Sequence, residues 1–178
     1  MKVRVKDIKD KVLDLSAVEE VADFPALARM QESGECLFLE PVDVRLSISR
    51  EYDHIRVKGE ISTRVRLACS RCLKEYDEGI SSSYTVFYLP ASNAPLDEEV
   101  ELLEQDLVSV SYSGEDIDFS AEIAEQVLME IPYKPLCVAD CLGLCPDCGV
   151  DLNNAACGCG RSDGSLKFSI LKNFEVKK

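Results

Sequence analysis

The sequence has very little histidine, and this shortage limits the chemistry that the protein can perform. His54 is the one histidine among 178 residues, and it lies in a turn-like segment. A hydrolytic nucleophile needs a base beside it, and neither a Ser-His nor a Cys-His arrangement can be assembled with this residue. The chain also lacks a glycine loop of the kind that cradles phosphate groups. We therefore expect a protein that is not an enzyme.

The sequence also lacks a long apolar run. No stretch approaches the roughly 20 residues that a membrane-spanning helix needs. Residues 1–6, Met-Lys-Val-Arg-Val-Lys, carry charges where the apolar core of a secretion signal would lie. A disulfide framework is typical of secreted proteins, so it explains the cysteines of this chain poorly. We expect a soluble cytoplasmic protein with reduced or metal-bound cysteines, without a membrane partner or a small-molecule substrate.

Positive charge is missing from residues 77–133, which hold fourteen acidic residues and no lysine or arginine. The formal net charge of −13 disfavours indiscriminate binding to nucleic acid, because the phosphates are repelled. Residues 45–75, by contrast, contain eight basic and four acidic residues. The two segments indicate alternative contacts: a local basic face for RNA, or an acidic surface for a protein partner.

Cysteine is abundant and clustered. The chain has nine cysteines, and six of them fall between residues 137 and 159. Cys145-Pro-Asp-Cys148-Gly149 has the form of a zinc knuckle, in which two thiolates three positions apart grip one ion. With a second Cys-x-x-Cys pair earlier in the chain, eight cysteines are candidate metal ligands. They are Cys69, Cys72, Cys137, Cys141, Cys145, Cys148, Cys157 and Cys159.

The spacing of these cysteines favours one or two structural zinc ions. Cys157-Gly-Cys159 can close the Cys145 knuckle across an eight-residue loop. Cys137-x3-Cys141 would then complete a second site with Cys69-x2-Cys72 and pin the cysteine-rich segment to the end of a sheet. Alternatively, one metal binds and the remaining cysteines stay passive. Four thiolates leave no open coordination position, which is typical of structural rather than catalytic zinc.

Other chemistries of cysteine are weaker alternatives. A redox pair would lie at the N-terminus of a helix, whereas Cys69 and Cys72 lie between two predicted strands. An iron–sulfur cluster would use the same ligands, although the Cys-Pro-x-Cys-Gly form favours zinc. Cys36, alone in its part of the chain, is expected to be a small buried apolar residue.

Alternating apolar and polar residues predict a long antiparallel hairpin. The alternation runs over residues 42–49, stops at the turn-like residues 51–54 and resumes as far as Leu67. A bulge or bend is expected near Gly59. Residues 83–89 predict a further strand, which follows the Cys69–Cys72 turn. Before the hairpin, residues 3–8 indicate a short strand and residues 16–22 have moderate helical character.

Apolar residues recur at helical spacing over residues 119–131, and Pro132 then ends the predicted helix. We expect an α+β fold in which a curved antiparallel sheet packs against this one helix. Three parts are predicted: an α+β domain over 1–135, a zinc-binding module over 136–160 and a basic tail over 161–178. Leu166, Ile170, Leu171 and Phe174 would share one face of a short helix in the tail, and residues 90–99 form the best loop candidate.

Basic residues on the outward face of the predicted hairpin are candidates for RNA contact. They are Arg56, Lys58, Arg64, Arg66 and Arg71, with Arg45 as a further possibility. An ordinary solvated face, balanced by acidic neighbours such as Glu60, explains the same pattern. Tyr84, Phe87 and Tyr88 could stack on bases, but side chains of this kind belong more often to a core.

Several motifs together resemble the YceD family, the large ribosomal RNA subunit accumulation proteins of bacteria and plastids. They are Leu67-Ala-Cys-Ser-Arg-Cys-Leu73, Ile131-Pro-Tyr-Lys-Pro-Leu-Cys137, Asp140-Cys-Leu-Gly-Leu-Cys-Pro-Asp-Cys-Gly149 and Asp151-Leu-Asn-Asn154, which leads to Cys157-Gly-Cys159. The resemblance runs from about residue 40 to 172. It implies a role in making or stabilising 23S ribosomal RNA during assembly of the large subunit, with ribosomal RNA or an assembly protein as partner and no known reaction. A protein-interaction adaptor, a thiol redox enzyme and an RNA-processing enzyme are the alternatives.

Overall fold

The structure, a computed structural model, describes residues 1–9, 11–52, 54–91 and 109–159. Its main element is a six-stranded sheet with the strand order β2-β4-β5-β6-β7, in which β3 also pairs with β5. All pairs are antiparallel except β6 and β7, which run parallel. The strands are β2 (Leu13–Glu19), β3 (Leu37–Phe38), β4 (Val42–Glu51), β5 (His54–Ala68), β6 (Glu75–Pro90) and β7 (Ser109–Tyr112).

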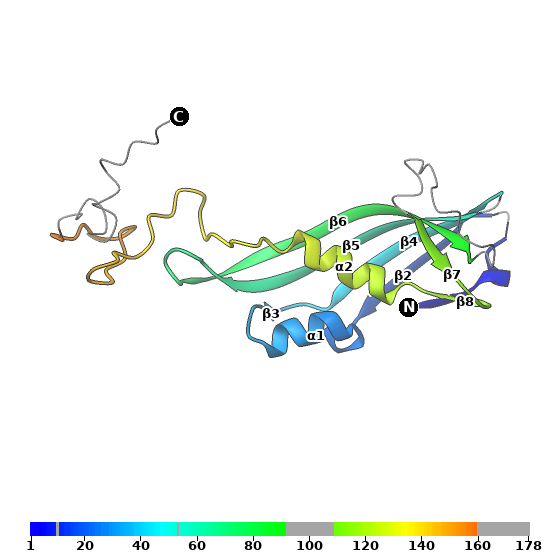
Figure 1. The fold of residues 1–178 in the computed structure, drawn as a ribbon, viewed down its shortest axis with the longest axis horizontal. Helices are drawn as coiled ribbons and strands as arrows, with labels where there is room; N and C mark the ends of the chain where they lie inside the picture. The colour runs from blue at the N-terminus through cyan, green and yellow to red at the C-terminus, as the bar shows by residue number, and fades with distance from the viewer. Residues whose placement is uncertain (10, 53, 92–108, 160–178) are drawn as a thin grey trace, which may run out of the picture.

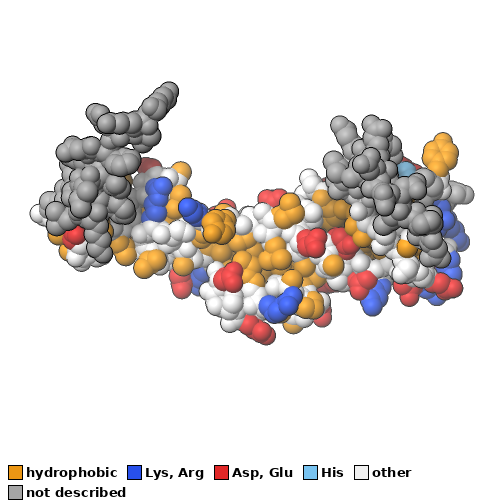
Figure 2. Space-filling view, in the orientation of Figure 1, with side chains coloured by type: hydrophobic (Ala, Val, Ile, Leu, Met, Phe, Trp, Pro, Cys, Tyr) orange, Lys and Arg blue, Asp and Glu red, His pale blue; other side chains and the backbone are white. Residues whose placement is uncertain are grey.

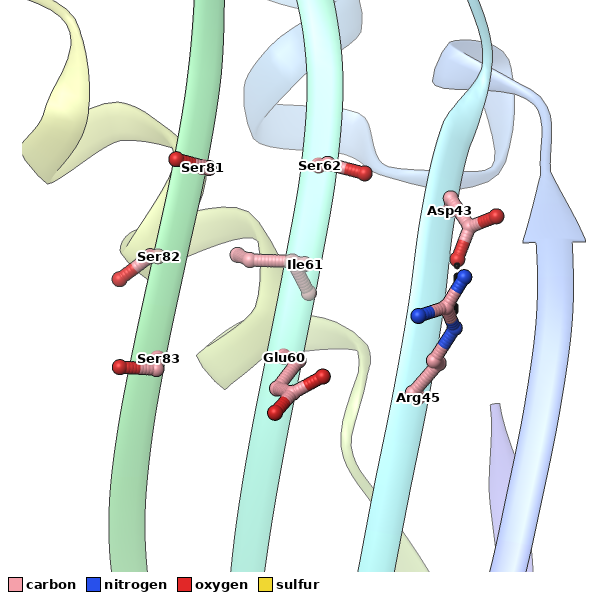
Figure 3. Close-up of a pocket in the computed structure, with 8 residues that line it drawn as sticks. All are labelled: Asp43, Arg45, Glu60, Ile61, Ser62, Ser81, Ser82 and Ser83. Carbon is pink, nitrogen blue, oxygen red and sulfur yellow. Dashed lines mark ion pairs between the residues drawn. The ribbon is translucent and has the colours of Figure 1, made fainter.

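Helices α1 (Pro25–Glu32) and α2 (Ser120–Glu130) lie on one face of the sheet. Figure 3 looks onto the opposite face, and both helical ribbons appear behind the strands. Phe24 and Leu27 at α1 and Phe119 and Ile123 at α2 are buried together with the inward side chains of β4 and β5. A separate ribbon pairs β1 (Lys2–Arg4) with β8 (Asp116–Asp118). The α+β class is therefore confirmed.

The long hairpin is present as predicted; of the expected bulge or bend near Gly59, the bulge is absent from the pairing of β4 with β5. Ile55, Val57, Ile61, Val65 and Leu67 are all buried on the inward face of β5. The pairing of β4 with β5 runs without interruption from Asp43↔Ser62 to Glu51↔His54. Gly59 has a packing reason instead, because a Cβ atom there would collide with the ring of Tyr84 on β6.

The aromatic side chains of β6 divide between the two faces. Tyr88 is buried and meets Phe119 edge to face with 5.3 Å between ring centroids, and Tyr84 packs against the same core. Phe87 lies on the other face, where its ring is 5.3 Å from the ring of His54. Two of the three candidate base-stacking residues therefore belong to the core.

Three expectations near the N-terminus were wrong or incomplete. Residues 16–22 do not form an α-helix: Leu13–Glu19 pairs along its whole length with β4, which overrides a moderate helical propensity, and a 3-10 turn, Val21–Asp23, follows. The first strand ends at Arg4, and a 3-10 turn, Val5–Asp7, follows. Helix α1, which Pro25 begins, was not predicted, so two helices rather than one pack on the sheet.

The predicted helix over 119–131 is confirmed as α2, and β6 ends at the start of the predicted loop over 90–99. The rest of that loop and the tail helix lie outside the described residues. No helix in the described part of the chain is both long and apolar enough to cross a membrane.

We predict that Gly59→Ala destabilises the sheet by about 1–3 kcal/mol, because the added methyl group overpacks the Tyr84 ring. Urea unfolding would measure the change. Gly79→Ala is the matched control, since it lies in the neighbouring strand and an added Cβ meets nothing within 4 Å. Equal stability of the two variants would contradict the packing role of Gly59.

Candidate metal centres

The structure brings the eight candidate ligands together in two groups of four. In each group all sulfur atoms lie within 4.8 Å of one another, and every cysteine is a free thiol. The grouping is the one that the spacing predicted. Centre 1 consists of Cys69, Cys72, Cys137 and Cys141, and centre 2 consists of Cys145, Cys148, Cys157 and Cys159.

Centre 1 joins the turn between β5 and β6 to the segment that follows α2. Cys69 Sγ lies 3.8 Å from Cys141 Sγ, and Cys72 Sγ lies 3.6 Å from Cys137 Sγ. A tetrahedral ion with metal–sulfur bonds of about 2.3 Å holds its sulfur atoms about 3.8 Å apart. The thiols of centre 1 therefore fit a zinc-sized ion with little movement.

Centre 2 lies on a short hairpin. This hairpin is found beyond that end of the sheet at which β5 turns into β6 (Figure 1). Leu144 and Asp151 form an antiparallel bridge, and the Cys145 N–H donates to the carbonyl of Val150 at 2.8 Å. Cys157 Sγ reaches back to within 3.4 Å of Cys145 Sγ. This spacing also suits four thiolates around one ion.

The Cys69–Cys72 and Cys145–Cys148 knuckles are separate turns with the same backbone conformation. The Leu73 N–H donates to the Cys69 carbonyl, and the Gly149 N–H donates to the Cys145 carbonyl, both at 2.9 Å. Both Leu73 (φ +60°) and Gly149 (φ +73°) adopt the left-handed conformation that favours glycine. The turn in centre 1 therefore forms despite the steric cost of a leucine side chain.

One thiol of each centre is poised to ionise first. Backbone N–H groups of Cys137 and Cys72 donate toward Cys69 and lower its pKa to about 6, and those of Cys148 and Asp147 lower the pKa of Cys145 to about 7. Burial raises the pKa of Cys137 to about 12, and neighbouring thiols contribute to that rise. A divalent cation would supply the charge that lets all four thiols of a centre deprotonate.

Asp151 and Asn153 connect the hairpin of centre 2 to a ligand of centre 1. The Asn153 side-chain oxygen accepts from the Leu142 N–H at 2.7 Å, and its amide nitrogen lies 3.4 Å from Cys141 Sγ. The same amide donates to Asp151 at 2.6 Å. N–H groups of Asn153, and then of Asn154, hold the pKa of Asp151 below its usual value. Sequence reasoning gave these residues no role, although they belong to a quoted motif.

Arg71 contacts the cysteine-rich segment, apart from the other basic residues that were predicted to contact RNA. Its Nη1 donates to the Cys141 carbonyl at 2.7 Å, and its own carbonyl accepts from the Leu144 N–H at 3.1 Å. Gly143, with φ +76°, allows this approach, because a Cβ there would lie 2.9 Å from the Arg71 carbonyl oxygen. The observed contacts of Arg71 are therefore structural.

The arginines of β5 are paired with carboxylates. Arg64 Nε lies 3.6 Å from Glu40, and Arg66 makes two hydrogen bonds to Asp77, at 2.7 and 3.1 Å. Arg56 forms an ion pair with Glu51. Lys58 makes no ion pair within the described residues. On the face drawn in Figure 2, acidic and basic side chains are likewise interspersed.

A shallow hollow of about 320 Å³ lies on the polar face of the sheet across β4, β5 and β6 (Figure 3). Arg45 lies in it, and its Nε is 3.6 Å from an oxygen of Asp43. Neither histidine nor cysteine lines this hollow. The candidate metal ligands therefore all lie at the cysteine-rich end of the described chain. Its lining consists of Asp43, Arg45, Glu60, Ile61, Ser62, Ser81, Ser82 and Ser83.

The fold and the two centres define a class: an α+β protein built on one large sheet, with two all-cysteine groups, suited to metal, at one end of that sheet. The chain belongs to the YceD family, since the family described as "Large ribosomal RNA subunit accumulation protein YceD" matches residues 57–175. The matched region contains β6, all of β5 after Arg56, and all eight clustered cysteines.

Two of three curated relatives carry the name of this family. A chloroplastic "Large ribosomal RNA subunit accumulation protein YCED homolog 1" of Arabidopsis thaliana is 26% identical over 163 residues, which cover 75% of this chain and 48% of the relative. The protein of the same name from Zea mays is 24% identical over 142 residues, covering 67% and 48%. An uncharacterised protein of Mycobacterium tuberculosis is 31% identical over 112 residues, covering 62% and 51%. The chain thus spans about half the length of these relatives, and no solved structure matches it.

We predict that Cys69→Ser loosens residues 137–141 as well as the β5–β6 turn, because centre 1 joins the two segments. Hydrogen exchange at 137–141 should accelerate at least about tenfold. Cys36→Ser is the control, since Cys36 is a buried free thiol outside both centres. Unchanged exchange at 137–141 in Cys69→Ser would show that the two segments hold together independently.

Proposed function

We propose that this protein supports the accumulation of 23S ribosomal RNA and the assembly of the large ribosomal subunit as a cytoplasmic, non-enzymatic binding factor. The observation that carries the proposal is the family match over residues 57–175, which includes both cysteine centres. Two relatives that extend beyond this region are named large ribosomal RNA subunit accumulation proteins. Ribosomal RNA or a large-subunit assembly protein is the partner in this proposal.

Both centres are proposed to hold structural zinc. Each offers four sulfur ligands, and four-coordinate zinc then has no position for a substrate. Between residues 137 and 159, the buried residues are Cys141, Gly143 and Cys145, so this segment has no apolar core of its own. Metal–thiolate bonds would therefore supply the cohesion that a core supplies elsewhere.

The outward face of β5 remains the proposed RNA contact, but its ion pairs change how it would act. A guanidinium group binds phosphate with the same planar fork that binds carboxylate. Arg56, Arg64 and Arg66 would therefore exchange their carboxylate partners for phosphates on contact with RNA. Because the face is charge-balanced before contact, it would recognise RNA at short range rather than attract it from a distance.

Two matched triple variants test this surface. Arg56→Gln, Arg64→Gln and Arg66→Gln together should weaken binding to large-subunit RNA and reduce the salt dependence, by about 0.7–0.9 in log–log slope for each phosphate that an arginine no longer neutralises. The carboxylate triple, Glu40→Gln, Glu51→Gln and Asp77→Asn, breaks the same ion pairs but releases the arginines. It should bind RNA at least as tightly as the parent.

Equal weakening in both triples would show that the ion pairs matter for the fold and that the arginines do not contact RNA. Parental RNA binding and RNA accumulation in the arginine triple would remove the basic face from the proposal. The acidic surface would then be the better contact, with a protein partner. Its described and exposed members include Glu78, Glu115, Asp116, Glu125 and Glu130.

A further inference from the structure

The two cysteine centres are adjacent in the chain as well as in space. Only residues 142–144 separate Cys141 of centre 1 from Cys145 of centre 2. Leu142, next to centre 1, donates its N–H to Asn153, which follows the hairpin of centre 2. Leu144, next to centre 2, donates its N–H to the carbonyl of Arg71, which lies between two ligands of centre 1. The link is therefore positioned by groups from both centres.

Asn153 is the residue through which the hairpin of centre 2 contacts centre 1. The strands of that hairpin meet at the Leu144–Asp151 bridge, and its turn is the Cys145 knuckle. The Leu152 N–H then donates to the Gly143 carbonyl at 2.9 Å, which directs the following residue toward centre 1. At this point the Asn153 amide reaches the Cys141 sulfur at 3.4 Å.

These contacts extend beyond a local turn at Asp151. Asp151 accepts from the backbone and side-chain N–H groups of Asn153 and from the side chain of Asn154. Such bonds alone would be an ordinary Asx turn. The bonds of Asn153 to Leu142 and toward Cys141 reach across eleven and twelve residues to the other centre. Amide donors to a metal-bound sulfur orient the ligand and tune the metal.

We propose that Asn153, held by Asp151, couples the two centres, so that a metal ion in centre 2 increases the metal affinity of centre 1. An ion in centre 2 would order the hairpin that contains Cys145. The ordered hairpin would hold Asn153 in position, and Asn153 would then orient the Cys141 sulfur for binding in centre 1. This inference rests on the proposed metal binding at both centres.

The test measures the affinity of centre 1 for Co²⁺ in the full-length chain, with and without a working centre 2. Cys148→Ser disables centre 2 and leaves every ligand of centre 1 in place. In the parent chain we expect this change to weaken Co²⁺ binding at centre 1 at least tenfold, about 1.4 kcal/mol. In an Asn153→Ala background the same change should weaken it less than twofold.

An isosteric variant separates coupling from simple loss of structure. Asn153→Asp keeps an oxygen for the Leu142 N–H but replaces the amide donor that faces Cys141 and Asp151. It should weaken Co²⁺ binding at centre 1 and shift the sulfur-to-cobalt charge-transfer band to lower energy, because a donor to the thiolate is removed. Asn154→Ala removes one bond to Asp151 without touching a sulfur atom, and it should retain the tenfold coupling.

The outcomes are distinguishable. An equal loss of affinity from Cys148→Ser in the parent and in Asn153→Ala would overturn the role of Asn153, since coupling would run along another path. An unchanged affinity in the parent would overturn coupling altogether. If the parent chain bound no Co²⁺ in centre 2, the proposed metal site itself would fail, whereas a bound ion without coupling would leave that site intact.

Discussion

The cysteine-rich end depends on the contact between sulfur atoms of two distant segments. Cys69 and Cys72 come from the β5–β6 turn, and Cys137 and Cys141 come from the chain after α2, yet their sulfur atoms lie within 4.8 Å of one another. The buried residues over 137–159 are two cysteines and a glycine, and three half-buried apolar side chains, Tyr76, Leu136 and Leu144, pack around the cysteines of centre 1. Structural zinc contributes about 10–16 kcal/mol in comparable small sites. Metal–thiolate bonds would therefore stabilise this end of the molecule in place of a hydrophobic core.

The sheet supplies the frame for this contact. The inward residues of β4 and β5 and the helices α1 and α2 form one apolar core, and Gly59 lets the Tyr84 ring close it. That core holds the β5–β6 turn and the end of α2 in place, and both then lead into centre 1. The outward face is polar and charge-balanced, with Arg56, Arg64 and Arg66 each paired to a carboxylate. The apolar core thus lies on one face of the sheet, and the proposed RNA contact lies on the other.

Sequence reasoning succeeded where the signal was local and periodic. Two residues between paired cysteines indicate a knuckle, and alternation identified the buried side of the β4–β5 hairpin. It failed where a partner comes from elsewhere in the fold. The sequence of residues 16–22 has helical character, but residues 16–19 pair with β4 as part of a strand. Alternation shows that Arg64 faces outward without showing that Glu40 lies beside it. The roles of Arg71 and Asn153 depend on contacts across 70 and 12 residues, which no short motif reveals.

Metal content of the full-length protein, measured together with hydrogen exchange before and after chelation, shows whether metal holds this end of the molecule together. The loaded protein should carry two zinc ions per chain and show protected amides over residues 137–159. Chelation should remove the protection there while β4 and β5 stay protected, because their core is apolar. If residues 137–159 stayed protected in a reduced, metal-free chain, metal would not take the place of a core at this end of the molecule.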